Sequence, residues 1–403
     1  MHTETTERKA QVTVLTGGID KPYALALTLE LISKGVSLDV IGSSELEGLE
    51  AQTSPHLAFL NLHGATQQKK SVSGKILGVM AFYVRLFRYC LTSKADVFHI
   101  LWNNRAVVFD RTILMVFYKM LGKRLVLTVH NVNAGKRDNC DSLLNRLTLR
   151  AQYHLADHLF VHTELMKRQL CDEFGITSAK STVIPFGLNS TVPNTSLTPE
   201  EAKAYLGMPD RAKSILFFGA IRPYKGLDQL VAAFQGIAGE KSEYRLVIAG
   251  ECRKGSAEYL DNIRRRIEGH PSKSQIITRI EYIPDGETEV YFKACDVLVL
   301  PYVHIFQSGV LFLAYNFGLP VIATNVGSFI EYIIEGQTGF LSRPGDVGDL
   351  AAQIKRYFES DLFKNIGCTR HKIRRRTEAL HSWKLVGAKT LQVYSTLMRD
   401  RRA

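Results

Sequence analysis

Short apolar runs, rich in β-branched and aromatic residues, alternate with helix-like segments along the chain, and this alternation constrains the fold most strongly. In the first half the strand-like runs are QVTVL, SLDVIGS, ADVFHILW, RLVLTVH, HLFVH and TVIPFG. Strands that are apolar throughout and separated by helices are typical of parallel sheets covered by helices on both faces. The sequence therefore predicts an α/β fold built from doubly wound sheets.

The same pattern starts again in the second half, where the strand-like runs are SILFFG, YRLVIAG, ITRIEYIP, DVLVLP and PVIAT. Between the halves, STVPNTSLTPEEAKAYLG is polar, contains Pro turns and offers a helix start at Thr198, as a linker would. A chain of 403 residues has room for roughly two to three domains. We therefore predict Rossmann-like domains over residues 1–190 and 208–382, facing a cleft, with a linker over 191–207.

The longest uncharged stretch, Val297–Ile330, lies between Asp296 and Glu331. A membrane span needs about 20 uninterrupted apolar residues, and proline and glycine interrupt this run repeatedly. The pattern instead predicts a strand VLVLP, a loop YVHIFQ, a helix SGVLFLAYNFG and a strand PVIAT. The junction of loop and helix lies at the carboxyl end of a strand, where α/β folds bind their ligands.

The formal net charge of +12 suggests an anionic partner, such as nucleic acid, an anionic membrane surface or a phosphorylated substrate. From Ala51 to Ala95 there is no acidic residue, and the apolar segment KILGVMAFYVRLFRYCL lies there. It is too short and too charged to cross ~30 Å of hydrocarbon. Either it forms a basic helix on an anionic membrane surface, through residues 69–94, or it packs on a sheet with a solvated basic edge. The basic residues are Lys69, Lys70, Lys75, Arg85, Arg88 and Lys94.

Other classes of function receive no support from the sequence. The six cysteines are scattered without a CxxC pair, which is typical of reduced thiols in a cytoplasmic protein, and the N-terminus has no signal-peptide pattern. No metal-ligand spacing, Walker loop or Ser-His-Asp order is present, so we expect no metal and no cofactor. Nucleic acid is not an expected partner, because the basic residues lack interleaved aromatic positions.

Two motifs in the first half place candidate site residues after predicted strands. Gly17 and Gly18 follow QVTVLT, where glycines either form a tight turn or let backbone N–H groups approach a phosphate or a sugar. His130 ends RLVLTVH, where an imidazole can bind a sugar hydroxyl or a transferred proton, or can serve as a capping or core histidine.

Two further candidates follow the first strands of the second half. Arg222 and Lys225 lie in the loop IRPYKG, and two cations three residues apart suit a diphosphate, although a solvated basic loop is the alternative. Glu251 follows YRLVIAG and is a weaker candidate.

The uncharged stretch supplies the last candidates, Gln307, Ser308 and Gly309, which open its predicted helix. The first N–H groups of a helix lack intrahelical partners and favour anions, and glycine allows close approach. Ser308 can also be an N-cap residue, a role compatible with ligand binding.

In their order and separation, these segments resemble family 4 of the retaining glycosyltransferases with the GT-B fold, in a bacterial polysaccharide-type branch with a QSG motif. The resemblance covers nearly the whole chain. The segments that carry it are the Gly-Gly turn, TVHN, VIPFGLN, FGAIRPYKGLDQLVAAF, LVIAGE, YIPDGETEVYFKACDVLVLPY and SGVLFLAYNFGLPVIATNVGSFIEYIIEGQTGFLSRPGD.

The resemblance implies a UDP- or GDP-sugar donor held by the second domain and a sugar or lipid-linked glycan acceptor on the first. It also implies transfer with retention, in exopolysaccharide or cell-surface glycan synthesis, and a last helix, 383–403, that returns to the first domain. Carried over by residue, Arg222 and Lys225 would contact the diphosphate, and His130 would approach the transferred sugar. Ser308 and Gly309 would lie at the phosphate or sugar, and Glu251 on the nucleotide side. The enzyme would be cytoplasmic or peripheral on the inner face of the membrane.

Two departures from the family pattern affect the donor site. Ile305 and Leu313 stand where the family often has two carboxylates, and Ala220 stands where it has an arginine. We interpret these as a variant donor site, held by backbone N–H groups, Ser308 and the cations of the other loop. The alternatives are a GT-B phosphorylase or synthase acting on a soluble sugar phosphate, or a non-catalytic partner of another transferase.

Overall fold

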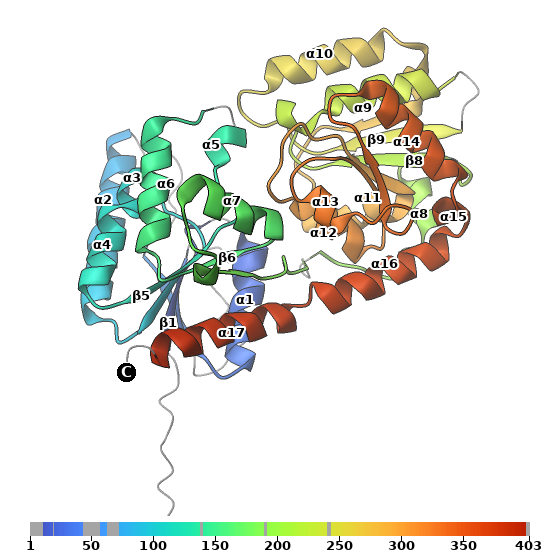
Figure 1. The fold of residues 1–403 in the computed structure, drawn as a ribbon. Helices are drawn as coiled ribbons and strands as arrows, with labels where there is room; N and C mark the ends of the chain where they lie inside the picture. Colours follow the sequence, from blue (N-terminus) through green and yellow to red (C-terminus); the bar gives the residue numbers. More distant parts are fainter. Residues whose placement is uncertain are drawn as a thin grey trace, which may run out of the picture. The chain divides into compact units, whose positions relative to one another are not determined.

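The structure, a computed structural model, consists of two units, each a parallel sheet with helices (Figure 1). Unit 1 comprises Met1–Gly187 and Ser382–Ala403, and unit 2 comprises Leu188–His381. The predicted α/β class with two doubly wound sheets is therefore confirmed. We expect no signal peptide at the N-terminus, and residues 1–10 lie outside the described residues. The structure describes residues 11–18, 20–42, 57–62, 72–137, 140–188, 192–239 and 243–399.

The sheet of unit 1 has the strand order β3-β2-β1-β4-β5-β6-β7, and every pair of neighbours is parallel. The first strand, β1, lies inside the sheet. Strands β2 and β3 extend the sheet on one side of β1, and β4 to β7 extend it on the other side. β3 is half-exposed at the edge and poor in β-branched residues, so the sequence pattern did not predict it. The strands are β1 (Gln11–Leu15), β2 (Ser37–Gly42), β3 (Leu57–Asn61), β4 (Val97–Ile100), β5 (Arg124–Thr128), β6 (His158–Val161) and β7 (Ser181–Val183).

The last helix of the chain, α17 (Trp383–Arg399), packs against the first, α1 (Lys21–Ser33). The hydroxyl of Tyr394 on α17 lies 2.6 Å from Nδ1 of His99 on β4, which ties the helix to the sheet. The predicted return of the C-terminal helix to the first unit is confirmed. The other helices of unit 1 are α2 (Val72–Thr92), α3 (Val107–Arg111), α4 (Ile113–Met120), α5 (Ala134–Arg137), α6 (Leu143–Leu155) and α7 (Glu164–Phe174).

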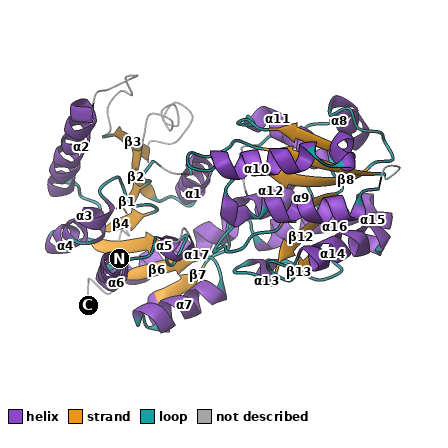
Figure 2. Cartoon of the chain, turned by 90° about the horizontal axis from the view of Figure 1, so that it is seen from above, coloured by secondary structure: helices purple, strands orange, loops and turns teal. Residues whose placement is uncertain are grey.

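The sheet of unit 2 has the order β10-β9-β8-β11-β12-β13, again with parallel neighbours, and reverses between β8 and β11. Helices surround the strands in both views (Figures 1 and 2). The strands are β8 (Lys213–Phe218), β9 (Tyr244–Ala249), β10 (Ile276–Arg279), β11 (Val297–Leu300), β12 (Val321–Thr324) and β13 (Gly339–Ser342). The helices are α8 (Pro199–Tyr205), α9 (Leu227–Ile237), α10 (Ala257–Glu268), α11 (Asp285–Ala294), α12 (Gly309–Asn316), α13 (Phe329–Tyr332), α14 (Val347–Glu359), α15 (Asp361–Lys364) and α16 (Ile366–Leu380).

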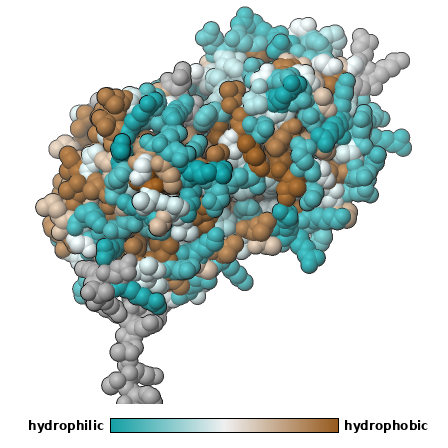
Figure 3. All heavy atoms as spheres, in the orientation of Figure 1, coloured by the Kyte–Doolittle hydropathy of each residue, from teal (hydrophilic) through white to brown (hydrophobic). Residues whose placement is uncertain are grey.

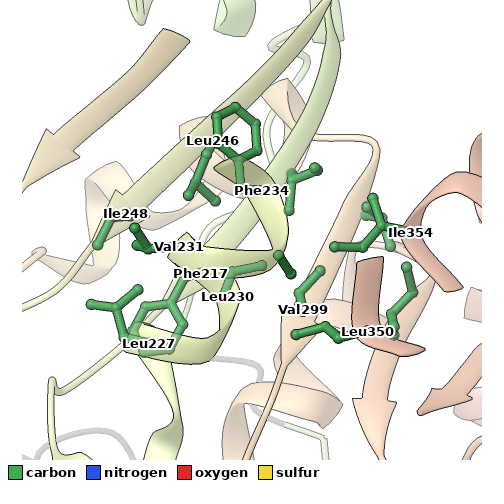
Figure 4. Close-up of a cluster of buried hydrophobic side chains, with 14 of the residues drawn as sticks. Phe217, Leu227, Leu230, Val231, Phe234, Leu246, Ile248, Val299, Leu350 and Ile354 are labelled. Atoms are coloured by element: carbon green, nitrogen blue, oxygen red, sulfur yellow. The ribbon is translucent and has the colours of Figure 1, made fainter. Parts of the chain in front are cut away.

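The core of unit 2 forms where α9 lies on the sheet (Figure 4). The buried side chains of α9 recur with the spacing of one helical face, and the strands beneath are apolar on this side. Burial of this surface fixes α9, and with it the loop that precedes it. The labelled residues are Phe217, Leu227, Leu230, Val231, Phe234, Leu246, Ile248, Val299, Leu350 and Ile354.

The segment predicted as a linker differs from that expectation in the part the structure describes. Thr198 caps α8 as predicted, with its hydroxyl accepting from the N–H of Glu201 while the Glu201 carboxylate accepts from the N–H of Thr198. α8 then packs against α11, so residues 192–207 belong to unit 2. Thr195 is also tied to α11 by hydrogen bonds. Its N–H and hydroxyl donate to the Glu289 carboxylate over 2.8 and 2.9 Å, and Lys293 donates to its carbonyl over 2.6 Å.

The long uncharged stretch folds as strand, loop, helix and strand, as predicted, with β11, α12 and β12 in that order. Within the described ranges, no helix combines the length and the hydropathy that a membrane crossing requires.

Candidate functional site

In unit 2, the loops after β8 and β11 meet where the strand order reverses, the position where open α/β sheets bind ligands. Gly226 has φ +66°, and a Cβ built on it would lie 2.0 Å from the carbonyl oxygen of Pro301. The N–H of Val303 donates to the carbonyl of Tyr224 over 2.8 Å. The two loops are therefore held together by backbone contacts that only glycine allows at position 226.

Lys225 brings a buried ammonium group to this junction. Its Nζ lies 5.4 Å from the ring centroid of Tyr302, in a cation–π contact. A Cβ built on Gly219 would lie 3.3 Å from this Nζ and 3.4 Å from the side chain of Val310. The ammonium group therefore lies beside the first turn of α12, whose N-terminus carries partial positive charge.

The N-terminus of α12 has no side-chain cap. Ser308 is the N-cap residue, but its hydroxyl accepts no hydrogen bond from the helix, so the sequence interpretation of a conventional cap is not realised. Gly309 is exposed, and a Cβ built on it would meet no atom within 4 Å. Open space and uncapped N–H groups beside Lys225 together form a suitable environment for an anion.

Two buried polar side chains at this edge lack partners among the described residues. Both Oε1 and Nε2 of Gln307 are buried without a hydrogen bond, and so is Oγ of Ser328, after β12. A buried polar group left unpaired costs about 1–3 kcal/mol, and a ligand atom or an ordered water at this edge would remove that cost. The loops that carry these side chains touch, because a Cβ on Gly327 would lie 1.8 Å from the carbonyl oxygen of Ile305.

The remaining predicted residues of unit 2 lie nearby with different surroundings. Arg222 is half-buried, precedes the turn Pro223–Lys225, and its guanidinium makes no ion pair or hydrogen bond with any described residue. Glu251 follows β9, but its carboxylate pairs with Arg253 over 2.8 Å. The structure thus places Arg222 in the Lys225 loop, whereas the Glu251 side chain is engaged elsewhere.

Ile305 and Leu313 are both buried apolar residues, 5% and 8% exposed. Neither position offers a charged group to a ligand, and each instead contributes to the packing of the loop and of α12.

In unit 1, the corresponding reversal lies between β1 and β4, and Gly17 packs tightly there. Its φ is +61°, and a Cβ on it would lie 2.8 Å from the carbonyl oxygens of Trp102 and Asn103, after β4. Gly18 also has a positive φ, of +72°, but faces open space, and its N–H donates to the Thr16 hydroxyl over 3.3 Å. Gly17 therefore has a clear structural role, whereas Gly18 is open to a ligand.

His130, after β5, stacks on Trp102 with ring centroids 4.2 Å apart and belongs to a chain of imidazoles. His162 Nδ1 lies 3.3 Å from the carbonyl oxygen of Ile184, which can only accept, so this nitrogen carries the proton. His162 Nε2, 3.1 Å from His130 Nδ1, then accepts from it, and His130 presents an unprotonated Nε2. That Nε2 is buried and has no partner among the described residues.

Burial is the main cause that holds the pKa of His130 well below its ordinary 6.5, and His162 adds to the effect. The neutral ring therefore offers a hydrogen-bond acceptor to a hydroxyl group.

Several participants were missed by the sequence analysis. Tyr302 supports Lys225, Ser328 adds an unpaired hydroxyl, and Trp102 forms the stacking surface for His130. Each lies at the end of a predicted strand-like run or in the segment that follows it, and this position was the available signal. Among the described residues no group of three or more His, Cys, Asp or Glu side chains could hold a metal ion.

Two family models match the chain and together cover most of it. The model described as Glycosyltransferase Family 4 matches residues 10–192, and the model described as Glycosyl transferases group 1 matches residues 199–378.

The chain is also similar to two named glycosyltransferases and to two solved structures. D-inositol 3-phosphate glycosyltransferase of Corynebacterium aurimucosum is 22% identical over 84% of this chain and 82% of its own length. A second relative of that name, from Catenulispora acidiphila, is 26% identical over 62% of this chain and 58% of its own length. Sucrose-phosphate synthase from Thermosynechococcus elongatus has the same fold, with a TM-score of 0.77 at 18% identity, covering 97% of this chain and all of that one. Anabaena HepE in complex with UDP-glucose gives 0.72 at 15% identity, covering 96% and 99%.

Proposed function

Because the chain belongs to glycosyltransferase family 4, with the GT-B fold, we propose that it transfers a sugar from a UDP- or GDP-sugar to a glycan or lipid-linked sugar with retention of configuration. The setting we propose is exopolysaccharide or cell-surface glycan synthesis, by a cytoplasmic enzyme peripheral to the inner face of the membrane. The solved structure of HepE with UDP-glucose supports a nucleotide-sugar donor.

One observation carries the proposal: the Lys225 ammonium lies beside the uncapped first turn of α12. A departing nucleoside diphosphate gains negative charge as the sugar–phosphate bond breaks. Fixed positive groups aimed at that charge stabilise the transition state more than the ground state, which is usually the largest electrostatic contribution to catalysis. Lys225, the unpaired Arg222 and the N–H groups after Ser308 would supply this stabilisation. They would do so without a metal ion.

The reaction needs one proton transfer. The bond between the sugar C1 and the phosphate oxygen breaks, and a bond between C1 and the acceptor oxygen forms on the same face. The proton of the acceptor hydroxyl passes to the leaving phosphate oxygen, so no protein base is required. This is compatible with a donor site in which Ile305 in the loop and Leu313 on α12 are buried apolar residues at positions where the family often has carboxylates.

His130 would accept a hydrogen bond from a hydroxyl of the transferred sugar. Its Nε2 is unprotonated and unpaired, and the stacked Trp102 limits its motion. Gln307 and Ser328 would bind donor oxygens in the same manner, because both are buried without partners.

The test is a panel of UDP- and GDP-sugars, read by thermal shift and by nucleotide release with and without glycan acceptors. A donor that binds only the folded protein raises its melting temperature. We expect one donor class to stabilise the wild type and to be turned over. Arg222→Ala and Lys225→Ala should each lose at least roughly tenfold in kcat/KM, because each removes a charge-assisted contact.

Two results would redirect the proposal. Full transfer activity in both variants would show that the diphosphate is held elsewhere. Donor binding without turnover by any acceptor would favour a non-catalytic partner of another transferase, and turnover of free sugar phosphates would favour a phosphorylase or synthase.

A further inference from the structure

One side of unit 1 carries an unusual number of exposed apolar side chains. Four helices, α2, α3, α4 and α6, hold thirteen of the nineteen exposed large hydrophobic side chains found among the described residues. We call this surface the helical face. Its apolar members are Ile76, Leu77, Met80, Val84, Leu91, Val107, Val108, Ile113, Val116, Met120, Leu143, Leu144 and Leu147.

The four helices form one continuous surface. Phe87 of α2 and Phe117 of α4 have ring centroids 4.6 Å apart, and Tyr83 of α2 donates to Asp110 of α3 over 2.7 Å. Arg111 of α3 donates to Asn145 of α6 over 2.8 Å. Figures 1 and 2 both show these helices side by side, and Figure 3 shows hydrophobic side chains gathered over α4 and α6.

α2 has two apolar faces, whereas a surface helix ordinarily has one. Phe82, Leu86 and Cys90 are buried against the unit at helical spacing. A second stripe points outward at spacings of three, four and seven residues: Leu77, Met80, Val84 and Leu91, 61–69% exposed. An apolar stripe of this length in water indicates a partner that covers it.

The charges on the helical face are mostly basic, although Asp141, which precedes α6, pairs with Arg146 over 2.6 Å. Arg85, Arg88, Arg146 and Arg150 are exposed on α2 and α6. The one acidic residue within the four helices is Asp110, which is buried and accepts from Tyr83. A surface both apolar and basic matches an anionic bilayer, whereas two copies of this chain meeting face to face would bring like charges together.

We propose that the helical face docks on an anionic lipid bilayer. Exposed apolar side chains of α2, α4 and α6 enter the headgroup boundary, and the arginines contact lipid phosphates. Of the stretch 69–94 predicted to contact the membrane, Lys69, Lys70 and the Lys75 side chain lie outside the described residues. The structure extends the surface well beyond that stretch, to three further helices.

The docked surface leads directly to the acceptor side of unit 1. Asn145 at the start of α6 donates to the side chain of Asn133 over 2.9 Å, and Asn133 lies in the segment that follows His130. Nδ2 of Asn133 is buried without a partner among the described residues. A lipid-linked acceptor in the membrane would therefore reach unit 1 beside α6. This last step rests on the proposed function, whereas the docking itself does not.

The test is sedimentation of the full chain with vesicles of phosphatidylcholine alone or mixed equally with phosphatidylglycerol. We expect binding to the anionic vesicles that weakens as salt is raised, and little binding to the neutral ones. Met80→Ser with Val84→Ser should lower the partition coefficient at least about tenfold, through lost apolar burial. Arg88→Gln should lower it about fivefold.

Tyr205→Ser is the matched control, because Tyr205 is 62% exposed on α8 in unit 2. It should bind vesicles as the wild type does, and all variants should keep the wild-type melting temperature and donor binding.

Wild-type protein that stays in the supernatant with anionic vesicles would overturn the docking proposal and the proposed membrane location, while leaving the proposed sugar transfer intact. A concentration-dependent dimer that the Met80→Ser/Val84→Ser variant abolishes, seen by sedimentation velocity without vesicle binding, would assign the face to a second copy instead.

Discussion

At the residue scale, Gly226 fixes the position of the neighbouring Lys225. It combines a left-handed backbone, φ +66°, with a contact to the Pro301 carbonyl that leaves no room for a Cβ. Gly207 has nearly the same φ, +68°, but a Cβ there would meet no atom within 4 Å. Substituting alanine at each of the two glycines therefore distinguishes two costs in stability. At Gly207 only the left-handed backbone is strained, whereas at Gly226 the added Cβ also clashes with Pro301.

We expect Gly207→Ala to lower the free energy of unfolding by about 1 kcal/mol, the cost of a left-handed alanine. Gly226→Ala should cost at least about 2 kcal/mol more, because the loop must also move away from Pro301. Urea unfolding of both variants measures the difference. Equal losses in the two variants would mean that the contact between the loops after β8 and β11 does not stabilise unit 2.

The places of the candidate site residues in the fold could be predicted from the sequence because they follow recognisable strands. Lys225, Ser308 and His130 each stand at the carboxyl end of an apolar run, and parallel strands bring such ends to one edge. The supporting groups could not be predicted in this way. The Tyr302 ring beneath Lys225 and the hydrogen-bonded imidazoles of His130 and His162 depend on side-chain packing, which the strand pattern does not encode.

At the scale of elements, α17 is joined to the sheet through a buried histidine. His99 lies between the Tyr394 hydroxyl on α17 and the Thr128 hydroxyl on β5, at 2.6 and 2.7 Å. Burial lowers the pKa of His99 from 6.5 to about 3. Because the unfolded chain takes up a proton near pH 6.5 and the folded chain does not, the stability from this group is complete above pH 6.5 and is lost as the pH falls towards 3.

In the wild type, the free energy of unfolding should fall as the pH is lowered from 6 to 4. In His99→Gln this fall should be shallower, by up to about 1.4 kcal/mol per pH unit. Tyr394→Phe should cost about 1–2 kcal/mol at neutral pH by leaving a ring nitrogen unpaired, yet keep the slope, because burial is the main cause of the shift. Denaturant unfolding across this range measures both. A wild-type slope in His99→Gln would show that His99 does not titrate in this way.

Elements with a strong pattern were predictable, and those decided by tertiary contacts were not. The strands with β-branched runs and the break of the uncharged stretch into β11, α12 and β12 follow directly from the sequence. β3 is a half-exposed edge strand with a weak pattern, and the described part of the presumed linker is held in unit 2 by the contact of α8 with α11. Such contacts override a local polar composition.

At the scale of the whole molecule, the two proposals assign separate tasks to two surfaces. Unit 2 carries the loop of Arg222 and Lys225, which we propose holds the donor, and unit 1 carries His130 and the helical face. The chain's net charge of +12 is compatible with both proposals, because nucleoside diphosphates and anionic lipids are negatively charged. Composition indicated an anionic partner, but only the structure separates the buried Lys225 from the exposed arginines of α2 and α6.

We propose that Lys225 and the N-terminus of α12 bind a nucleoside diphosphate. Its most direct test is titration calorimetry of the full chain with UDP, GDP and the corresponding monophosphates, for wild type and Lys225→Met, a change that keeps the length of the buried side chain. We predict that the preferred diphosphate binds more tightly than its monophosphate. Lys225→Met should weaken its binding by about 2 kcal/mol, roughly thirtyfold in Kd, with little change for the monophosphate. Equal diphosphate affinity in a folded Lys225→Met variant would contradict the account.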